Sequence, residues 1–274
     1  MTDGAGPGKD DRLLAPTRWT AIAIVPVLLA AFVILYGFPD RTNDLWAWTI
    51  KPTMTAMLMG GGYLAGAWFF VRVARAREGH RALTGLGGVT LFTAMLLLAT
   101  IIHWDKFNHG HVSFWAWLFL YVITPLLLPL LWWNNGRTDP GTRAPDDPLV
   151  PLPIRAMMAT TGALVLLAAI MWFVRPTLIM AHWPWKLTPL TTRSMCAYFA
   201  FPAMTWLLFA VDGRWSAHEI PMQTASIGLV MIMVAAVRAA DEFSGDSAPA
   251  YVALLAVVLC FLVGVQAVMI RRAA

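Results

Sequence analysis

The sequence predicts an all-α integral membrane protein with eight transmembrane helices, built as two tandem repeats of four helices. Three observations predict this class. Apolar residues make up 59% of the chain and charged residues 13%, whereas a soluble domain carries about 25% charged residues. A short motif occurs twice, half a chain length apart. The chain also contains eight apolar runs of the length that crosses a bilayer, about 20 residues: 19–37, 53–73, 84–102, 113–133, 156–174, 193–211, 222–240 and 250–270.

The duplicated motif is Trp-x-Trp-x-x-x-Pro, which runs from Trp46 to Pro52 and again from Trp183 to Pro189. The two copies are 137 positions apart, half of the 274-residue chain. At this offset, nine of the forty positions from 16 to 55 are identical. Such self-similarity predicts a tandem duplication. Because each repeat has an even number of helices, both copies cross the membrane in the same direction, and a pseudo-two-fold axis along the membrane normal should relate them.

The loops predict where the parts of the chain lie. Residues 1–14 form a disordered cytoplasmic tail, 15–135 the first repeat, 136–152 a proline-rich cytoplasmic linker and 153–274 the second repeat. With the N-terminus in the cytoplasm, 13 Lys and Arg residues lie inside and 7 outside, which the positive-inside rule favours. Both termini are then cytoplasmic, in a multi-pass protein of the cell membrane. The basic excess faces anionic lipid head groups and requires no nucleic acid.

The tryptophan motif precedes the second helix of each repeat and has two interpretations. Tryptophan is enriched at membrane interfaces and proline at the first position of a helix, so the motif is typical of an interfacial anchor at a helix start. Alternatively, the two copies face each other and form an outward vestibule with two positive helix N-termini at its floor. The residues predicted to bind a ligand in this vestibule are Trp46, Trp48, Lys51, Asp105, Trp183, Trp185, Lys186, Arg193 and Asp241.

The stretch after the third apolar run is dense in side chains that bind metals. Imidazole is a common ligand of zinc, copper and haem iron, and a carboxylate can complete such a site. Four of the six histidines fall in predicted outer loops, so zinc, copper and haem are the candidate cofactors. The spacing matches no metal signature, and the alternative is a set of solvated histidines in turns between helices. The predicted metal ligands are His103, Asp105, His109, His111 and His182.

Acidic residues mark the outer ends of the third and seventh helices. With a one-residue slip in the repeat, Asp105 aligns with Asp241. Arg238 lies three residues before Asp241 and four before Glu242, so the pattern predicts an ion pair on one helix face. The alternative is a partly buried acid that carries a proton or a cation near a channel mouth.

The glycines of the second helix and the two cysteines predict packing. Gly60, Gly61 and Gly62 are consecutive, and glycine in a transmembrane helix favours close approach to a neighbouring helix. Cys196 and Cys260 lie in apolar runs. They are predicted to be packed thiols and not a disulfide.

The sequence has no Gly-rich phosphate loop, no Gly-x-Ser-x-Gly elbow and no His-Glu-x-x-His motif. This favours a non-enzymatic role without deciding it. The leading hypothesis is transport or permeation of a small solute or ion, which the duplication and the proline-interrupted helices support. The alternatives are an outer-face metal- or haem-binding redox or metal-handling protein, a non-catalytic subunit or scaffold of a membrane complex, and a lipid-modifying enzyme with His103 and Asp105 as an acid–base pair. The predicted partners are the lipid bilayer and either a second copy of the chain or another membrane protein.

Overall fold

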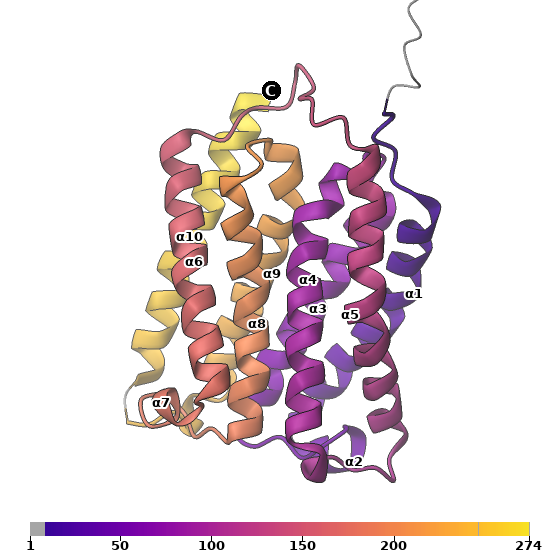
Figure 1. The fold of residues 1–274 in the computed structure, drawn as a ribbon. Coiled ribbons are helices and arrows are strands. Elements are labelled where there is room, and N and C mark those ends of the chain that lie inside the picture. The colour runs from indigo at the N-terminus through magenta and orange to yellow at the C-terminus, as the bar shows by residue number, and fades with distance from the viewer. Residues whose placement is uncertain (1–8, 246, 274) are drawn as a thin grey trace, which may run out of the picture.

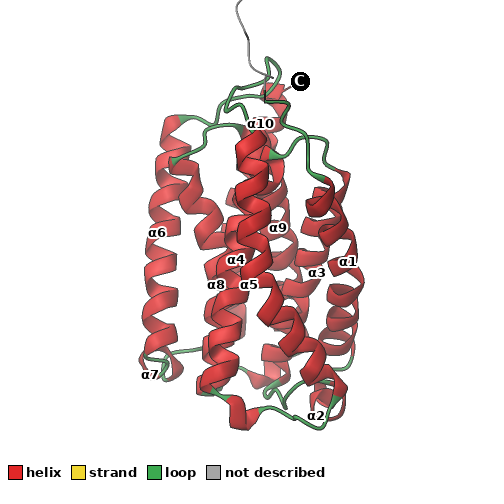
Figure 2. Ribbon diagram, turned by 45° about the vertical axis from the view of Figure 1, so that its right-hand side comes forward, coloured by secondary structure: helices red, strands yellow, loops and turns green. Residues whose placement is uncertain are grey.

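Long helices lie side by side along the length of the molecule (Figures 1 and 2). The computed structural model describes residues 9–245 and 247–273, and this part of the chain contains helices and turns but no strand. The long helices are α1 Ala15–Phe32, α3 Thr53–Arg75, α4 His80–Ile102, α5 Val112–Thr138, α6 Leu152–Val174, α8 Pro189–Leu207, α9 Trp215–Arg238 and α10 Ser247–Ala273. The single-turn helices are α2 Thr42–Leu45 and α7 Thr177–Met180. A π-helical turn extends α1 to Gly37, and a 3-10 turn extends α8 to Ala210.

Seven of these helices are long and apolar enough to cross a membrane: α1, α3, α4, α5, α6, α9 and α10. The predicted all-α, membrane-spanning class is therefore confirmed for the described residues. α8 has 19 residues and is not among the seven, because its first turns carry Arg193 and several hydroxyl side chains. Large apolar side chains cover the outer surface, for example Leu126 (70% exposed) and Val257 (68% exposed). Such a surface suits lipid tails, which are as apolar as leucine.

Most helices begin several residues before the predicted apolar run. α9 shows the reason, because it begins at Trp215 whereas the run begins at 222. Its first turn is polar, and Asp147 stabilises it by accepting a hydrogen bond from the backbone N–H of Ser216 at 3.0 Å. The first N–H groups of a helix need such partners. Hydropathy alone does not detect this turn, since a contact from a distant part of the chain holds it.

Four inner helices, α3, α4, α8 and α9, form the centre of the bundle. α1 packs on α3, α5 on α4, α6 on α8 and α10 on α9, while α4 contacts both α8 and α9 and α3 contacts α9. A Cβ on Gly61 of α3 would lie 2.8 Å from the Cβ of Met231 of α9, so the predicted close approach at these glycines is confirmed. Cys196 is buried, Cys260 is exposed, and both are free thiols.

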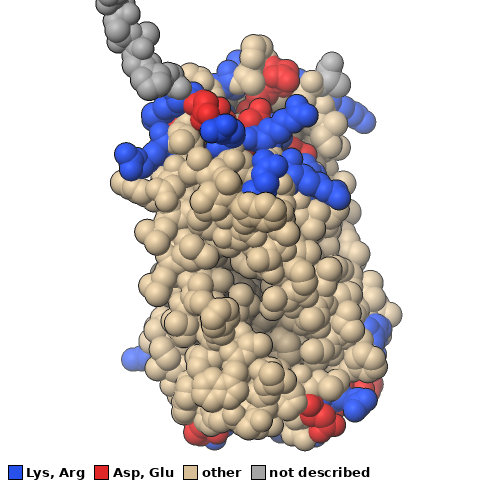
Figure 3. Space-filling view, turned by 90° about the vertical axis from the view of Figure 1, so that its right-hand side faces the viewer, with Lys and Arg blue, Asp and Glu red and all other residues tan. Residues whose placement is uncertain are grey.

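The two ends of the bundle differ. The linker end carries the first described residues, the loop 139–151 and the end of α10 (Figure 1). Lysines and arginines crowd at this end, and a wide uncharged band separates them from the other end on the face that Figure 3 shows. The tryptophan end carries α2, α7 and both copies of the tryptophan motif.

Part of the predicted disordered tail is ordered. Leu13 is 3% exposed, and its N–H donates to the carbonyl oxygen of Arg77 at 2.8 Å. Residues 9–14 therefore lie against the linker end of the bundle. Residues 1–8 of the predicted tail lie outside the described residues.

Candidate functional site

The motif tryptophans lie in two aromatic clusters at the tryptophan end. The rings of Trp48 and Phe107 have centroids 5.0 Å apart, and those of Trp185 and Phe243 have centroids 5.1 Å apart. Trp46, Trp48 and Trp185 are at most 7% exposed. These rings fill the protein interior beside the helix starts, whereas an interfacial anchor would place its N–H among the lipid head groups.

Most charged residues of the predicted vestibule, in contrast to these tryptophans, are exposed to solvent. Lys51, Lys186, Asp105 and Asp241 are exposed. Asp105 forms an ion pair with Lys106 at 2.8 Å. Because water and salt screen exposed charges, these side chains create only a weak field at a distance. A ligand site shared by the nine vestibule residues stays a prediction.

Both helix starts behind the tryptophan motifs are capped. Glu242 accepts hydrogen bonds from the N–H groups of Thr53 at 2.8 Å and Met54 at 2.7 Å, and so places a negative charge at the N-terminus of α3. At α8, Thr188 caps the helix by accepting a hydrogen bond from the N–H of Thr191 at 3.2 Å. A carboxylate at a helix N-terminus offsets the positive end of the dipole. The start of α3 therefore has little capacity left to attract an anion.

Arg238 does not form the ion pair predicted at the end of α9. Its guanidinium donates to the carbonyl oxygen of Tyr36 at 3.0 Å and lies 5.1 Å from the centroid of the Tyr36 ring. Glu242 is turned instead toward α3 in the first half of the bundle. The spacing of Arg238 and the acids on α9 was compatible with an ion pair. In the packed bundle, however, both Arg238 and Glu242 bind residues of the first half instead.

His103 and Arg193, predicted for different sites, contact each other. Nη1 of Arg193 lies 2.7 Å from Nε2 of His103, and Nε of Arg193 donates to the carbonyl oxygen of Phe173 at 3.0 Å. Burial and the neighbouring guanidinium lower the pKa of His103. A neutral imidazole can accept the hydrogen bond from Arg193 through Nε2, so this nitrogen is engaged.

The remaining predicted metal ligands also lie apart. The ring of His109 stacks on Trp104 with centroids 4.9 Å apart. His111 caps α5 by accepting a hydrogen bond from the N–H of Ser113 at 3.2 Å. His182 is exposed. The five predicted ligands include no group of three within metal-binding distance in the described part of the chain.

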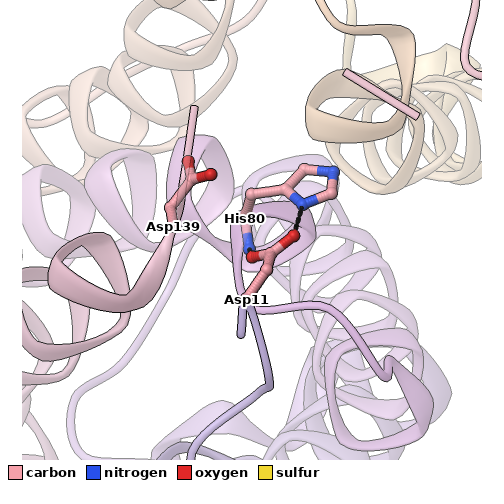
Figure 4. A group of neighbouring side chains, drawn as sticks. All are labelled: Asp11, His80 and Asp139. Atoms are coloured by element: carbon pink, nitrogen blue, oxygen red, sulfur yellow. Dashed lines mark hydrogen bonds and ion pairs between the residues drawn. The ribbon is translucent and has the colours of Figure 1, made fainter. Parts of the chain in front are cut away.

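A polar group that does meet this criterion lies at the linker end, where Asp11, His80 and Asp139 converge (Figure 4). Ligand atoms of all three lie within 4.8 Å of one another. Oδ2 of Asp11 lies 2.5 Å from Nδ1 of His80, and Oδ1 accepts a hydrogen bond from the His80 N–H at 3.1 Å. The group joins the first described residues to the start of α4 and the end of α5.

Arg214 supplies a positive charge to this group. Its Nη1 and Nη2 donate to the two oxygens of Asp139 at 2.9 and 2.7 Å, and Nη2 also donates to Asp212 at 2.7 Å. Burial alone would raise the pKa of either aspartate, but the hydrogen bonds from Arg214 outweigh it and hold both pKa values below the usual range. Because Asp139 already faces a fixed cation, the group fits an ion-pair network better than a divalent-metal site.

The network continues from His80 to α9 and the linker. Nε2 of His80 lies 2.7 Å from Oγ of Ser216, and this Oγ lies 2.6 Å from Oδ2 of Asp147. The order Asp11, His80, Ser216 is that of a catalytic triad. Asp147, however, binds both the hydroxyl and the N–H of Ser216, which is 4% exposed. The chain of hydrogen bonds therefore holds four segments together at the linker end.

A cavity of about 690 Å³ lies between the helices of the bundle. Its walls combine aliphatic side chains with aromatic ones, including Tyr63, Phe92, Tyr121 and Tyr198. Among the described residues, no charged side chain lines it. Figure 3 shows a hollow at mid-height of an uncharged face.

Few polar groups line the cavity, and three of them lack a protein partner. The hydroxyls of Tyr63 and Tyr121 form a hydrogen bond of 2.9 Å. The hydroxyl of Tyr198 and the indole N–H groups of Trp183 and Trp206 are buried and unpartnered among the described residues. An unpaired buried polar group costs about 1–3 kcal/mol. Because these polar atoms themselves are buried, a bound molecule with acceptor oxygens would remove that cost only if the side chains turned toward it.

The cavity was missed at the level of sequence, although a signal existed. The chain has five tyrosines, and Tyr63, Tyr121 and Tyr198 all fall within predicted apolar runs. A hydroxyl within a membrane span needs a partner in the bundle interior. These residues could therefore have marked an internal site.

Comparison with known proteins assigns no function to the chain, so a function has to be argued from the geometry of the cavity and the polar groups described above. No protein family model matches the chain, and neither a curated protein nor a solved structure matches it.

Proposed function

We propose that this polytopic membrane protein is a carrier that binds a small lipid-soluble molecule in the aromatic cavity. The observation that carries the proposal is a cavity of about 690 Å³ with apolar walls and three buried, unpartnered polar groups. Pockets for small molecules measure about 300–1,000 Å³ and combine apolar walls with a few placed polar groups. The transport hypothesis thereby narrows to a solute that dissolves in lipid.

An ion does not suit this cavity. The hydroxyls of Thr93 and Thr124 in its lining already donate to backbone carbonyl oxygens of their own helices, at 3.1 and 2.7 Å. The described lining offers no charged side chain to balance an ion. Burying an isolated charge in apolar surroundings is very costly, whereas a hydrogen-bonded neutral group is tolerated. A neutral molecule with one or two acceptor oxygens would match the unpartnered donors once their side chains turn toward it.

Residues on the lipid-facing surface belong to the lining, which supports entry from the bilayer. Leu254 and Val257 of α10 are 60% and 68% exposed, and both line the cavity. The outer helices α6 and α10 pack on different inner helices, α8 and α9. A molecule dissolved in the lipid can reach the aromatic walls between these outer helices without passing through water.

The proposal includes eight membrane crossings, with α8 as the eighth because it lies between α4 and α6. The packing of α1, α3, α4 and α5 recurs in α6, α8, α9 and α10, and α4 contacts α8 as α9 contacts α3. The contact between Trp48 and Phe107 recurs between Trp185 and Phe243. This pattern supports two repeats related by a pseudo-two-fold axis along the membrane normal.

The same reasoning supports an orientation. Of the 20 Lys and Arg residues, 13 belong to the N-terminal residues, the linker, the C-terminus and the loops on the linker side. The positive-inside rule places this side in the cytoplasm. We therefore propose that the protein lies in the cell membrane and that its linker end faces the cytoplasm.

The other hypotheses have less support. The predicted metal ligands have separate partners, so a zinc, copper or haem site at the tryptophan end has no geometric basis among the described residues. His103 contacts Arg193 while Asp105 pairs with Lys106, which does not favour an acid–base pair. A scaffold role and a homo-oligomer stay predictions.

The substitution Ala168→Phe tests the proposal. Ala168 lines the cavity from α6, so a phenyl ring there would take up volume that the solute needs. Leu167→Phe is the matched control, because Leu167 is 65% exposed and does not belong to the lining. The protein is reconstituted in lipid nanodiscs and labelled with a neutral photoactivatable lipophile. Mass spectrometry then maps the labelled residues.

Labelling of cavity residues such as Met158 and Tyr198 is expected in the natural protein and in the Leu167→Phe control. Ala168→Phe should lower it several-fold while labelling of the outer surface is unchanged. Labelling confined to the outer surface of the natural protein would show that the cavity does not take up lipid-soluble molecules. Equal cavity labelling in all three proteins would show that labelling does not depend on the volume beside Ala168, which would also contradict the proposal.

A further inference from the structure

A second pocket, of about 310 Å³, lies at the linker end where α3 turns into α4. Four arginines dominate it, and we call it the arginine pocket; its lining residues are Arg72, Arg75, Ala76, Arg77, Glu78, Arg81 and Ile220. Glu219 lies beside the lining and binds two of the arginines. Four arginines against two glutamates leave a formal charge of +2 on this group.

Two of the arginines are held in place. The carboxylate of Glu219 accepts hydrogen bonds from Nη2 of Arg72 at 3.1 Å and from Nη1 of Arg81 at 3.2 Å. Gln223 also accepts a hydrogen bond from Arg72, at 2.5 Å. Each guanidinium has five N–H groups, so these contacts fix the side chains and leave donors over. A ligand would then meet an arrangement that needs little further ordering.

The other two arginines keep all their donors. Arg75 and Arg77 are exposed. Among the described residues, neither guanidinium donates a hydrogen bond or forms an ion pair. Their charge is therefore available to a ligand in the pocket.

The corresponding turn of the second half shows that the fold does not require this free charge. At the offset of 137, Arg77 aligns with Arg214. Arg214 binds Asp139 and Asp212 and is 9% exposed. The turn before α9 thus has its arginine neutralised by aspartates, whereas the turn before α4 has exposed arginines without a partner among the described residues.

The arginine pocket lies at the level expected for lipid head groups. Trp68, one turn before Arg72 on α3, is 38% exposed, and the Arg72 guanidinium lies 5.8 Å from the centroid of its ring. Exposed tryptophan marks the membrane interface. Guanidinium groups bind phosphate strongly because two parallel N–H groups match two of its oxygens.

We propose that the arginine pocket binds the phosphate of an anionic lipid headgroup at the linker end. Arg75 and Arg77 provide the free donors, while Arg72 and Arg81, fixed by Glu219, form the wall behind them. Phosphate is also present free in solution, so the experiment has to separate these two sources. The binding site is distinct from the aromatic cavity and does not depend on the solute proposed for it.

The test compares two double variants that lose the same charge at the same end. Arg75→Gln/Arg77→Gln removes the free donors of the pocket, whereas Arg271→Gln/Arg272→Gln removes two exposed arginines at the end of α10. Native mass spectrometry measures binding of phosphatidylglycerol and phosphatidylcholine to the full chain. Each basic side chain near an anionic membrane surface contributes about 1 kcal/mol, so the pocket variant should bind phosphatidylglycerol roughly 10- to 30-fold more weakly.

The control variant is expected to change this affinity by less than about threefold, since charge at a distance is screened. Equal losses in the two variants, or no preference for phosphatidylglycerol over phosphatidylcholine in the natural protein, would overturn the proposal. Inorganic phosphate is titrated as a separate arm. If it binds with the same dependence on Arg75 and Arg77 while phosphatidylglycerol does not bind, the lipid assignment is wrong.

Discussion

Thr55→Val is expected to destabilise the protein by breaking a hydrogen bond between its two halves. The indole N–H of Trp185 donates to Oγ1 of Thr55 at 2.9 Å, from the second tryptophan motif to the first turn of α3. Trp185 is 1% exposed and Thr55 is fully buried. Valine nearly preserves the shape of threonine but offers no acceptor. The N–H would then remain buried without a partner.

The expected magnitude follows from that unpaired group. Leaving a buried donor unsatisfied costs about 1–3 kcal/mol. A change of 1 kcal/mol lowers the melting temperature by about 2–4 °C in a chain of roughly this size. Thr55→Val should therefore lower the melting temperature by roughly 2–12 °C in detergent solution, with the lower half of this range expected because membrane bundles can rearrange to find new partners.

A double-mutant cycle isolates the hydrogen bond. Trp185→Phe removes the N–H donor, so Thr55→Val should cost little more in that background. The free energies of unfolding of both single variants and the double variant give the coupling energy, expected at about 1–2 kcal/mol. Thr192→Val is the control at the duplicated position, because Thr192 donates to the carbonyl oxygen of Thr188 in its own helix at 2.8 Å.

A coupling energy near zero would refute the reasoning. The loss in Thr55→Val would then come from packing alone and would persist after Trp185→Phe. A loss in Thr192→Val as large as that in Thr55→Val would likewise show that burial of a threonine, and not the bond to Trp185, sets the magnitude.

Two further predictions concern the charged contacts. Glu242→Gln should lower the free energy of unfolding by about 1–2 kcal/mol, because it removes a charged cap from α3. Asp241→Asn, at the exposed neighbouring residue, is the control. Equal melting temperatures for the two variants would contradict the capping role. The lowered pKa values of Asp139 and Asp212 mean that their ion pairs contribute stability above the pKa of an unfolded aspartate, near 4, and that this is lost as the pH falls through the lower folded values. Melting temperatures from pH 7 to pH 3 should fall for the natural protein, and Arg214→Gln should be less stable at pH 7 and flatten this dependence; an unchanged slope would count against the ion pairs.

The helices could be predicted from the sequence because their signals are local. The apolar runs placed the long helices, and proline marked two of the starts: Pro189 is the first residue of α8, and Pro52 directly precedes α3. Gly61 correctly predicted close helix packing. Each of these signals acts within a few turns of its own residue, through hydropathy, backbone geometry or side-chain volume.

The polar contacts could not be predicted because they depend on distant residues. His80 contacts Asp11, 69 positions away, and Ser216, 136 positions away. Arg238 had two acids at favourable spacing on its own helix, yet it donates to Tyr36, 202 positions away. Helical spacing indicates which side chains can meet on one helix, but only the packed bundle decides which ones do.

On the proposed duplication, corresponding positions of the two halves have taken different roles. Thr55 accepts a hydrogen bond from Trp185, whereas the N–H of Trp48 has no partner among the described residues. Arg214 is neutralised by aspartates, whereas Arg77 keeps its donors. The bond between Trp185 and Thr55 holds the two halves together and has no counterpart at Trp48, so a difference between the halves does not by itself mark a ligand site. Of the two differences, the one at Arg77 lies at a pocket, the arginine pocket for which we propose phosphate binding.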